Sequence, residues 1–354
     1  MGSQRVSRIR GTGSFLPPTV LTNAQLFEVE SIRDGFDVER ARSSLRDEGD
    51  AESLAPVEVF DRWARQVTGI RERRVAAADD GLTTEAMCAH ASRDALDRAG
   101  IDARDVDLIL VASVTPSDNV PNAACTVGHL LGIPETGGFT LNGACTGFVH
   151  ALAAAHGFIQ SGTAEVVLAV AGDVLTRITN YGDPTTAVLF SDGAGAAVLT
   201  AGSEGGVLGP PFLSANYARE HLYIVGQGWE TEADPRPRLR MGGGPRVLRR
   251  AIQAMANAAG EALSRAGLDW DTVDLVVPHQ ANLRITRGLE NHLELPRGRV
   301  VHTIERYGNC SAATVGIALD ESLRGVHGPL PDPARVVLTA VGGGYTTAAM
   351  VVDI

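Results

Sequence analysis

An internal repeat is the feature that most constrains the fold of this chain. Residues 95–102, ALDRAGID, match residues 262–269, ALSRAGLD, without a gap at an offset of 167 residues. Two further matches extend the repeat, VDLIL at 106–110 with VDLVV at 273–277 and AEVVL at 164–168 with ARVVL at 334–338. Because self-similarity at a fixed spacing indicates duplicated structural units, we expect two halves of one architecture.

Each repeat reads as a helix ended by a glycine, followed by a short apolar strand. Continuous Val, Ile and Leu runs that alternate with helices are typical of largely parallel sheets covered on both faces. We therefore predict an α/β fold of two pseudo-twofold-related halves, residues 1–200 and 201–354. A single dinucleotide-binding domain is the competing fold, but no G-x-G-x-x-G motif follows the first strand.

Residues 31–60 are charged and rich in serine, with weak helical periodicity. We expect this segment to be a surface insertion that forms a short helix or an ordered loop. Disorder is the alternative.

Composition excludes several classes of function. A formal net charge of −11 opposes a general affinity for nucleic acid. The longest apolar runs are far shorter than the roughly 20 residues that span a bilayer, and no signal-length apolar segment opens the chain. We therefore expect a cytoplasmic protein with no membrane or nucleic-acid partner.

The four cysteines are then expected to be reduced thiols, and none lies within four residues of another, as a zinc knuckle would require. They are Cys88, Cys125, Cys145 and Cys310. We expect no metal site.

A local basic patch is still possible. The run from 238 to 250 holds five arginines and no acid, and two more follow in the next predicted helix; they are Arg238, Arg240, Arg246, Arg249, Arg250, Arg284 and Arg287. They could bind an acidic partner or simply lie on solvated helix faces.

The candidate nucleophile is Cys145, in LNGACTGF at 141–148. This stretch reads as a strand end and a tight turn, and the apolar helix that follows extends to about Gln160. A thiol at a helix N-terminus has a lowered pKa, so we expect a thiolate at neutral pH. An inert buried cysteine is the alternative. His150 lies about 140° away around the helix and is excluded as its base.

The candidate base is His279, at the end of the predicted strand 276–278, where side chains reach a cleft; a core histidine is the alternative. Asn309, in YGNCSAA at 307–313, offers a neutral amide, or is an ordinary helix N-cap. Gly342–Gly344 can direct backbone N–H groups into an oxyanion hole, or form a plain hairpin turn.

Together these motifs resemble the 3-oxoacyl-(acyl-carrier-protein) synthase III family, over nearly the whole chain. The matching stretches are TGSFLPP near the start, TGIRER at 68–73, GACTGF around Cys145, LFSDGAGAAVL at 189–199, PHQANLRI around His279, YGNCSAA around Asn309 and the terminal GGGYTT.

The resemblance implies a homodimer of thiolase fold, with a layered αβαβα core. Cys145 would take an acyl group from a thioester, and His279 and Asn309 would stabilise the enolate formed from a second, malonyl-type thioester. Backbone N–H groups of Cys145 and Gly343 would form the oxyanion hole. No tightly bound cofactor is implied, since coenzyme A or phosphopantetheine thioesters are the substrates.

The resemblance also implies binding residues away from the thiol. Trp63 and Arg177 match positions that contact the nucleotide end of coenzyme A, and Val120 and Asn282 would line the path of the acyl or phosphopantetheine chain. An acidic acyl carrier protein would dock on three arginines, Arg246, Arg249 and Arg284.

Departures from the family pattern suggest a specialised enzyme. Val67 stands where an arginine is common, Val120 replaces a large aromatic, and Asn291 and His292 replace basic residues. They indicate a ketosynthase of polyketide or specialised fatty-acid assembly, fed by carrier proteins. The alternatives are an acyltransferase that passes the Cys145 acyl group to a hydroxyl or amine, and a non-enzymatic scaffold or chain-length subunit.

Overall fold

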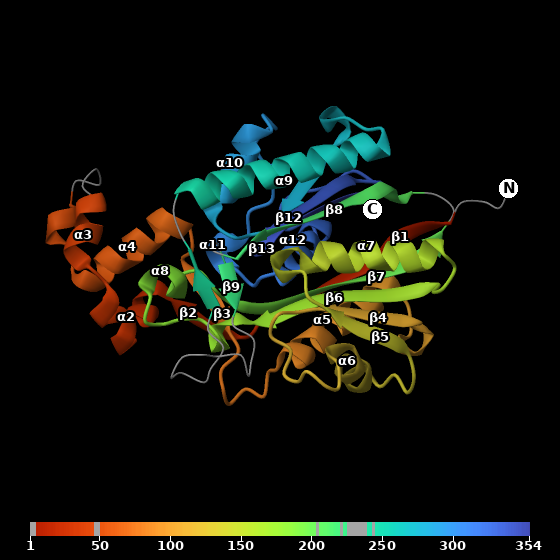
Figure 1. Cartoon of the computed structure of the whole chain (residues 1–354), viewed down its shortest axis with the longest axis horizontal. Helices are drawn as coiled ribbons and strands as arrows, with labels where there is room; N and C mark the ends of the chain where they lie inside the picture. Colours follow the sequence, from red (N-terminus) through yellow and green to blue (C-terminus); the bar gives the residue numbers. More distant parts are fainter. Residues whose placement is uncertain (1–4, 46–49, 203–204, 220–221, 225–238, 243–244) are drawn as a thin grey trace.

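Two stacked β-sheets form the centre of the molecule (Figure 1). The computed structural model describes residues 5–45, 50–202, 205–219, 222–224, 239–242 and 245–354. The five-stranded sheet has the order β1 (Val6–Phe15), β7 (Asp192–Gly202), β6 (Val166–Val174), β4 (Leu108–Ala112) and β5 (Gly137–Leu141). The four-stranded sheet has the order β8 (Gly206–Ala218), β13 (Gly344–Asp353), β12 (Arg335–Gly342) and β11 (Leu275–Pro278).

The two sheets share one strand order, which confirms the duplication. Strands β1, β7, β6 and β4 correspond to β8, β13, β12 and β11 in turn. The place of β5 in the second half is taken by an isolated parallel bridge between Val276 and Val300. The boundary at residue 200 remains a proposal.

Helices complete five layers, as predicted (Figure 1). Helices α5 (Thr84–Ala99) and α6 (Ala123–Leu131) cover the outer face of the five-stranded sheet. Helices α7 (Gly147–Gln160) and α12 (Ala313–Leu323) lie between the sheets, and α9 (Pro245–Ala266), flanked by α10 (Leu283–His292), covers the four-stranded sheet.

The prediction of largely parallel sheets is wrong. In these two sheets three strand pairs are parallel and four are antiparallel. Strand β4 is buried along its whole length, as expected, but so is most of the antiparallel strand β7. Helices on both faces produce the same continuous apolar runs whatever the strand direction, so the sequence pattern could not separate the two cases.

Small residues bring the central helices close to the five-stranded sheet. A Cβ on Gly195 of β7 would lie 2.7 Å from the backbone carbon of Gly316 in α12. A Cβ on Gly147, the first residue of α7, would lie 3.2 Å from the Ala312 Cβ. The two helices therefore begin next to each other, which fixes where the turns before them meet.

Residues 31–60 form more structure than the surface insertion that was predicted. They contain α2 (Glu30–Gly35), α3 (Val38–Ser44), the 3₁₀ turn η2 (Ala51–Ser53) and the start of α4 (Pro56–Thr68), with residues 46–49 outside the description. Their apolar side chains are buried with those of α4, among them Ile32, Phe36, Ala41, Leu45, Ala51 and Phe60. The weak periodicity reflects helices too short to show a repeating face.

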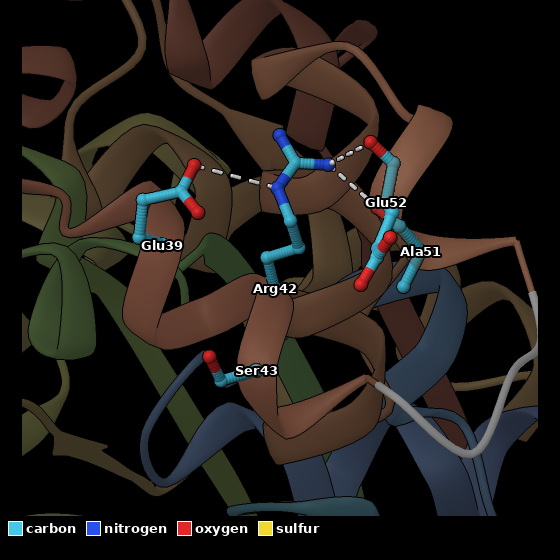
Figure 2. A pocket seen from close by; sticks show the side chains of 5 residues that line it. All are labelled: Glu39, Arg42, Ser43, Ala51 and Glu52. Carbon is cyan, nitrogen blue, oxygen red and sulfur yellow. Dashed lines mark hydrogen bonds and ion pairs between the residues drawn. The ribbon is translucent and has the colours of Figure 1, made fainter.

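Arg42 connects α3 to the segment around the 3₁₀ turn η2 (Figure 2). Its guanidinium donates to the carbonyls of Ala51, Glu52 and Leu54 and pairs with Glu39. A cavity of about 350 Å³ opens here, lined by Glu39, Arg42, Ser43, Ala51 and Glu52. Because the Arg42 guanidinium already donates to these carbonyls, we interpret its role at this cavity as structural.

The remaining described elements are short. They are β2 (Thr19–Thr22), β3 (Glu72–Val75), β9 (Leu222–Ile224), β10 (Leu239–Met241), α1 (Asn23–Phe27), α8 (Pro184–Ala187), α11 (Ile304–Tyr307) and the 3₁₀ turns η3 (Ala103–Asp105), η4 (Ala144–Thr146), η5 (Leu175–Arg177) and η6 (Trp270–Thr272). Within the described residues, no helix is both long and apolar enough to cross a membrane.

A first prediction follows from the contact between Gly195 and Gly316. Gly195→Ala would force the backbones of β7 and α12 apart. It should lower the free energy of unfolding by roughly 1–3 kcal/mol and so lower the urea midpoint of unfolding. The control is Gly157→Ala in α7, where an added Cβ meets nothing within 4 Å and should leave stability unchanged or raise it by about 0.4–1 kcal/mol. Equal midpoints for the two variants would contradict the close approach.

Candidate active site

Cys145 lies in the 3₁₀ turn η4, directly before the buried helix α7. The preceding residue, Ala144, has a positive φ of 48°, and the Asn142 side chain accepts a hydrogen bond from its N–H at 3.1 Å. Thr146 closes the turn by donating from its hydroxyl to the Gly143 carbonyl. The turn thus holds the thiol in one place, 7% exposed, at the start of a helix.

The predicted thiolate at neutral pH is not supported by this environment. Burial raises the pKa of the Cys145 thiol to about 12; the Ser311 hydroxyl lowers this pKa and the Asp173 carboxylate raises it further. The helix N-terminus is present as predicted, but burial is the largest influence on the pKa of this thiol, and it disfavours the anion. Cys145 therefore rests as a neutral thiol.

His279 follows strand β11 directly and is 1% exposed. Its N–H donates to the Thr339 carbonyl at 2.8 Å, which extends the parallel ladder with β12 and fixes the backbone. Nδ1 lies 2.7 Å from the Thr314 hydroxyl, while Nε2 has no hydrogen bond to any described residue. Burial lowers the pKa of His279 to about 3, so the imidazole is neutral.

Asn309 is not the N-cap of α12, because Ala312 holds that position. Its backbone forms a parallel bridge with Phe190, just before β7. Its side-chain oxygen accepts from the Ser311 N–H at 2.9 Å, and among the described residues its side-chain NH₂ has no partner. The amide group therefore has its donors available.

The turn at residues 309–314 brings the three groups together. The Ser311 hydroxyl lies 3.9 Å from the Cys145 sulfur, and the Asn309 side chain bonds to the Ser311 backbone. Thr314, one helical turn later, donates to the Ser311 carbonyl and contacts the His279 ring. Residues from both halves thus meet at one turn.

This turn is the counterpart of the Cys145 turn in the other half. Ser311 has a φ of 53°, close to the 48° of Ala144, and both residues donate to an asparagine two positions earlier. The offset between the two turns is the same 167 residues as in the sequence repeat. The duplication therefore places two similar turns face to face.

The glycine hairpin between β12 and β13 lies against the Cys145 turn. A Cβ on Gly342 would lie 3.0 Å from the Cys145 nitrogen. Thr346 bonds to Thr146 and to the Gly143 carbonyl, which ties the hairpin to the turn. Gly343 follows Gly342 directly, and a Cβ there would meet Leu222 of β9 instead of the Cys145 turn. The segment is a hairpin turn packed on the Cys145 turn, and the oxyanion role of its N–H groups stays a prediction.

The proposed nucleotide-binding residues have contacts of their own. The Trp63 ring of α4 is half-buried against Phe36 and Phe60, with ring centroids 5.0 and 5.8 Å away. Arg177 is exposed and donates to the Leu82 carbonyl at 2.9 Å. Neither is linked to the Cys145 turn by a contact among the described residues.

Val120 and Asn282 differ in surroundings. Val120 is 87% exposed, unusual for an apolar side chain. Asn282 caps α10, since its side chain accepts from the Arg284 N–H and donates to the Val67 carbonyl. The second amide N–H of Asn282 has no partner among the described residues.

The arginines lie on neighbouring helices. Arg249 and Arg250 are exposed on α9, Arg284 and Arg287 are exposed on α10, and the two helices pack together. In the described part of the chain, Arg249 and Arg284 form no ion pair. Arg238 and the side chain of Arg246 lie outside the described residues.

Sequence reasoning missed the residues that connect the site. Ser311, Thr314 and Thr346 were not singled out, although each contacts a candidate residue or its turn. Asp173, whose charge raises the pKa of Cys145, was missed as well. The repeat offered a signal for Ser311, which pairs with Ala144 beside the nucleophile. Within the described residues, no group of three or more His, Cys, Asp and Glu side chains could hold a metal ion.

Comparison with known proteins agrees with this architecture. Residues 139–215 match the family "3-Oxoacyl-[acyl-carrier-protein (ACP)] synthase III", and residues 263–354 match its C-terminal part. The β-ketoacyl-[acyl-carrier-protein] synthase III of Xanthomonas campestris pv. campestris is 38% identical over 349 residues, 98% of each chain.

Solved structures give the same result. The 3-oxoacyl-[acyl-carrier-protein] synthase III of Aquifex aeolicus superposes with a TM-score of 0.82 at 32% identity, covering 98% of this chain and 100% of that one. The priming β-ketosynthase from the R1128 polyketide pathway has a TM-score of 0.84 at 32% identity, covering 100% and 98%. The fold is thus that of the thiolase-type condensing enzymes. The chain belongs to the 3-oxoacyl-(acyl-carrier-protein) synthase III family, as its motifs predicted.

A second prediction follows from the buried, neutral thiol of Cys145. In a Cys125→Ser background, which removes the exposed cysteine, alkylation of Cys145 by iodoacetamide should accelerate continuously with pH beyond about pH 10. The raised pKa leaves little thiolate at neutral pH. Peptide mass mapping at each pH gives the rate, and a plateau below about pH 8 would contradict this environment.

Proposed function

We propose that this chain is a condensing enzyme that joins an acyl group carried on Cys145 to a malonyl-type thioester, with loss of carbon dioxide. One observation carries the proposal: Cys145, His279 and Asn309 are linked by short contacts through the turn at 309–314. A buried thiol that one turn links to a neutral imidazole and to an amide with unpaired donors suits carbon–carbon bond formation.

In the first stage, the Cys145 sulfur attacks the carbonyl carbon of an acyl thioester. Because the thiol rests protonated, its proton passes to His279 Nε2 as the sulfur–carbon bond forms. The tetrahedral intermediate then breaks its bond to the departing thiol, which takes that proton from His279. The acyl group remains on Cys145, and the imidazole is neutral again.

In the second stage, the carboxylate of the malonyl-type thioester leaves as carbon dioxide, and its electron pair forms an enolate. The Asn309 NH₂ and a protonated His279 Nε2 donate to the enolate oxygen. The enolate carbon attacks the acyl carbonyl and expels the Cys145 thiolate, which takes a proton from solvent. The product is a 3-oxoacyl thioester.

Thr314 supports both roles of His279. A hydroxyl can either accept from Nδ1–H or donate to a bare Nδ1, so Nε2 can be a base in one stage and a donor in the other. The Ser311 carbonyl keeps a bond from the Thr314 N–H at 3.3 Å when the hydroxyl turns to His279. Between the stages Nε2 gains one proton from solvent and Nδ1 loses one to solvent, so the ring changes tautomer with no net change of charge and leaves no buried group unpaired.

The oxyanion of each tetrahedral intermediate would be stabilised by the N–H groups of Cys145 and Gly343. The proximity of Gly342 to the Cys145 nitrogen supports this pairing. One such donor typically contributes about 2.7–4 kcal/mol to lowering the barrier.

We infer that the donor acyl group arrives on the phosphopantetheine arm of a carrier protein rather than on free coenzyme A. The Trp63 ring packs against Phe36, and the Arg177 guanidinium serves a backbone carbonyl, so both have roles besides nucleotide binding. Asn282 and Val120 would line the path of the chain. Fatty-acid and polyketide assembly are both consistent with this substrate class, and the cytoplasm would be its location.

An acidic carrier protein would dock near Arg246, Arg249 and Arg284, of which Arg249 and Arg284 are exposed on adjoining helices.

A second copy of the chain would pair along β5. This strand ends its sheet with one unpaired edge, carries the half-exposed Phe139, and lies close in sequence to the exposed Val120. An apolar sheet edge left open invites pairing, which favours a homodimer.

Two alternatives differ in chemistry. An acyltransferase would pass the Cys145 acyl group to a hydroxyl or amine, which favours a carboxylate base, whereas Asn309 offers a neutral donor suited to an enolate. A non-enzymatic scaffold or chain-length subunit would need no such group. The complete Cys, His and Asn set favours condensation over both.

The third prediction tests the enolate step. Alanine at His279 or Asn309 should lower carbon dioxide release from malonyl-carrier protein by roughly 10²- to 10³-fold, because each removes one donor to the enolate. The exposed His90 of α5, stacked on Phe15, supplies a matched control, and His90→Ala should match the wild type. Undiminished release from either alanine variant would reject the assigned roles.

A further inference from the structure

Two of the motifs that this chain shares with its family have no role in the proposed mechanism. They are TGIRER at 68–73 and LFSDGAGAAVL at 189–199. The first ends at Arg73 in strand β3, and the second begins in the segment that precedes strand β7. Both segments contact the loop that carries Asn309. Their residues are therefore candidates for holding that amide in place.

Arg73 is a buried cation, 1% exposed. Its guanidinium donates to the carbonyls of Val188 and Leu21, each at 3.2 Å, and to the Asn23 Oδ1 at 2.7 Å. Its Nε has no hydrogen-bond partner, and among the described residues Arg73 forms no ion pair. Burying a charge without a carboxylate partner costs stability, and an apolar side chain would fill the space at lower cost. The contacts of this guanidinium thus point to a role beyond packing.

The segment just before β7 holds the backbone of Asn309. The Asn309 N–H donates to the Leu189 carbonyl at 2.9 Å, and the Asn309 carbonyl accepts from the Ser191 N–H at 3.1 Å. The Ser191 hydroxyl ties the same segment to β3, because it donates to the Arg74 carbonyl and accepts from the Arg74 N–H, both at 2.8 Å. Together with the guanidinium of Arg73, strand β3 therefore fixes this segment at two points.

Gly308 brings the loop directly onto the same two residues. It has a positive φ of 66°, and a Cβ there would lie 2.9 Å from the Ser191 Cβ and 3.3 Å from the Arg73 Cβ. The residue before Asn309 thus packs on both side chains without a side chain of its own. A change at either residue would be transmitted to the adjoining amide.

The thiol and the imidazole are held by other contacts. The Thr146 hydroxyl closes the Cys145 turn by donating to a carbonyl within it. The His279 N–H donates to the Thr339 carbonyl, and the His279 ring contacts Thr314. None of these bonds involves β3 or the segment before β7. A displacement of that segment should therefore move the amide and spare the thiol and the imidazole.

We propose that Arg73 and Ser191 are positioning residues for Asn309, the donor to the enolate. This inference rests on the proposed role of Asn309 in the second stage. Arg73 fixes the Val188 carbonyl, and Ser191 bonds the same segment to β3, so the amide is in place before the enolate forms. Neither residue touches the reacting atoms, and neither exchanges a proton with them.

The test measures the two stages separately for each variant, per amount of folded enzyme. The first rate is acylation of Cys145 by an acyl thioester, followed by intact mass, and the second is carbon dioxide release from malonyl-carrier protein. Arg73→Met and Ser191→Ala should each lower carbon dioxide release roughly tenfold to hundredfold, because the donor is displaced. Each should leave the acylation rate within about twofold of the wild type, since that stage does not use Asn309.

Arg42→Met is the matched control. It also removes a guanidinium that donates to backbone carbonyls, but these belong to the segment around η2. Both rates should stay close to those of the wild type. Ser191→Ala is the milder of the two test variants, and it decides the question should Arg73→Met fail to fold, judged by its circular dichroism spectrum.

Double variants with Asn309→Ala show whether the two residues act through the amide. Once the amide is removed, Arg73→Met and Ser191→Ala should cause no further loss of carbon dioxide release. Losses that multiply in the double variants, or equal losses in both stages, overturn this inference and leave the proposed function standing. An acylated wild-type enzyme that releases no carbon dioxide overturns the proposed function, and this inference with it.

Discussion

The contact between two similar turns, one from each half, is the constraint on which the rest of the site depends. The Cys145 turn and the turn at 309–314 each combine an asparagine with a residue of positive φ two positions later. They meet because Gly147 and Ala312 allow the helices behind them to begin side by side. A duplicated fold thus yields a single site, in which one half supplies the thiol and the other supplies the amide and the imidazole's partner.

Burial is the second determinant of the chemistry. The same packing that joins the turns excludes water, raises the pKa of the thiol and lowers that of His279. Neutral groups are well suited to a reaction whose charge exists only briefly, on an oxyanion, an enolate or a departing thiolate. Donors already in place then stabilise that charge as it forms, without first having to reorient around a resting anion.

The repeat was sufficient to predict two α/β halves, because topology follows the duplicated order of helices and strands, and the family resemblance added the five layers. It could not reveal strand direction, since β6 and β7 are buried alike yet run antiparallel. The three candidate residues came from motifs, but the protonation state of Cys145 did not. A helix N-terminus is visible in the sequence, whereas the burial that opposes it comes from segments about 165 to 200 residues away, at Ser311 and Thr346. The buried helices of 31–60 were too short to show a clear periodicity.

The central claim is that Cys145 carries the acyl group, and intact-mass measurement tests it most directly. After incubation with a panel of acyl thioesters, the account predicts a mass increase equal to one acyl group, mapped to the Cys145 peptide and absent from Cys145→Ala. The mass would also identify the preferred donor. An adduct of the same mass on the Cys145→Ala protein would contradict the account.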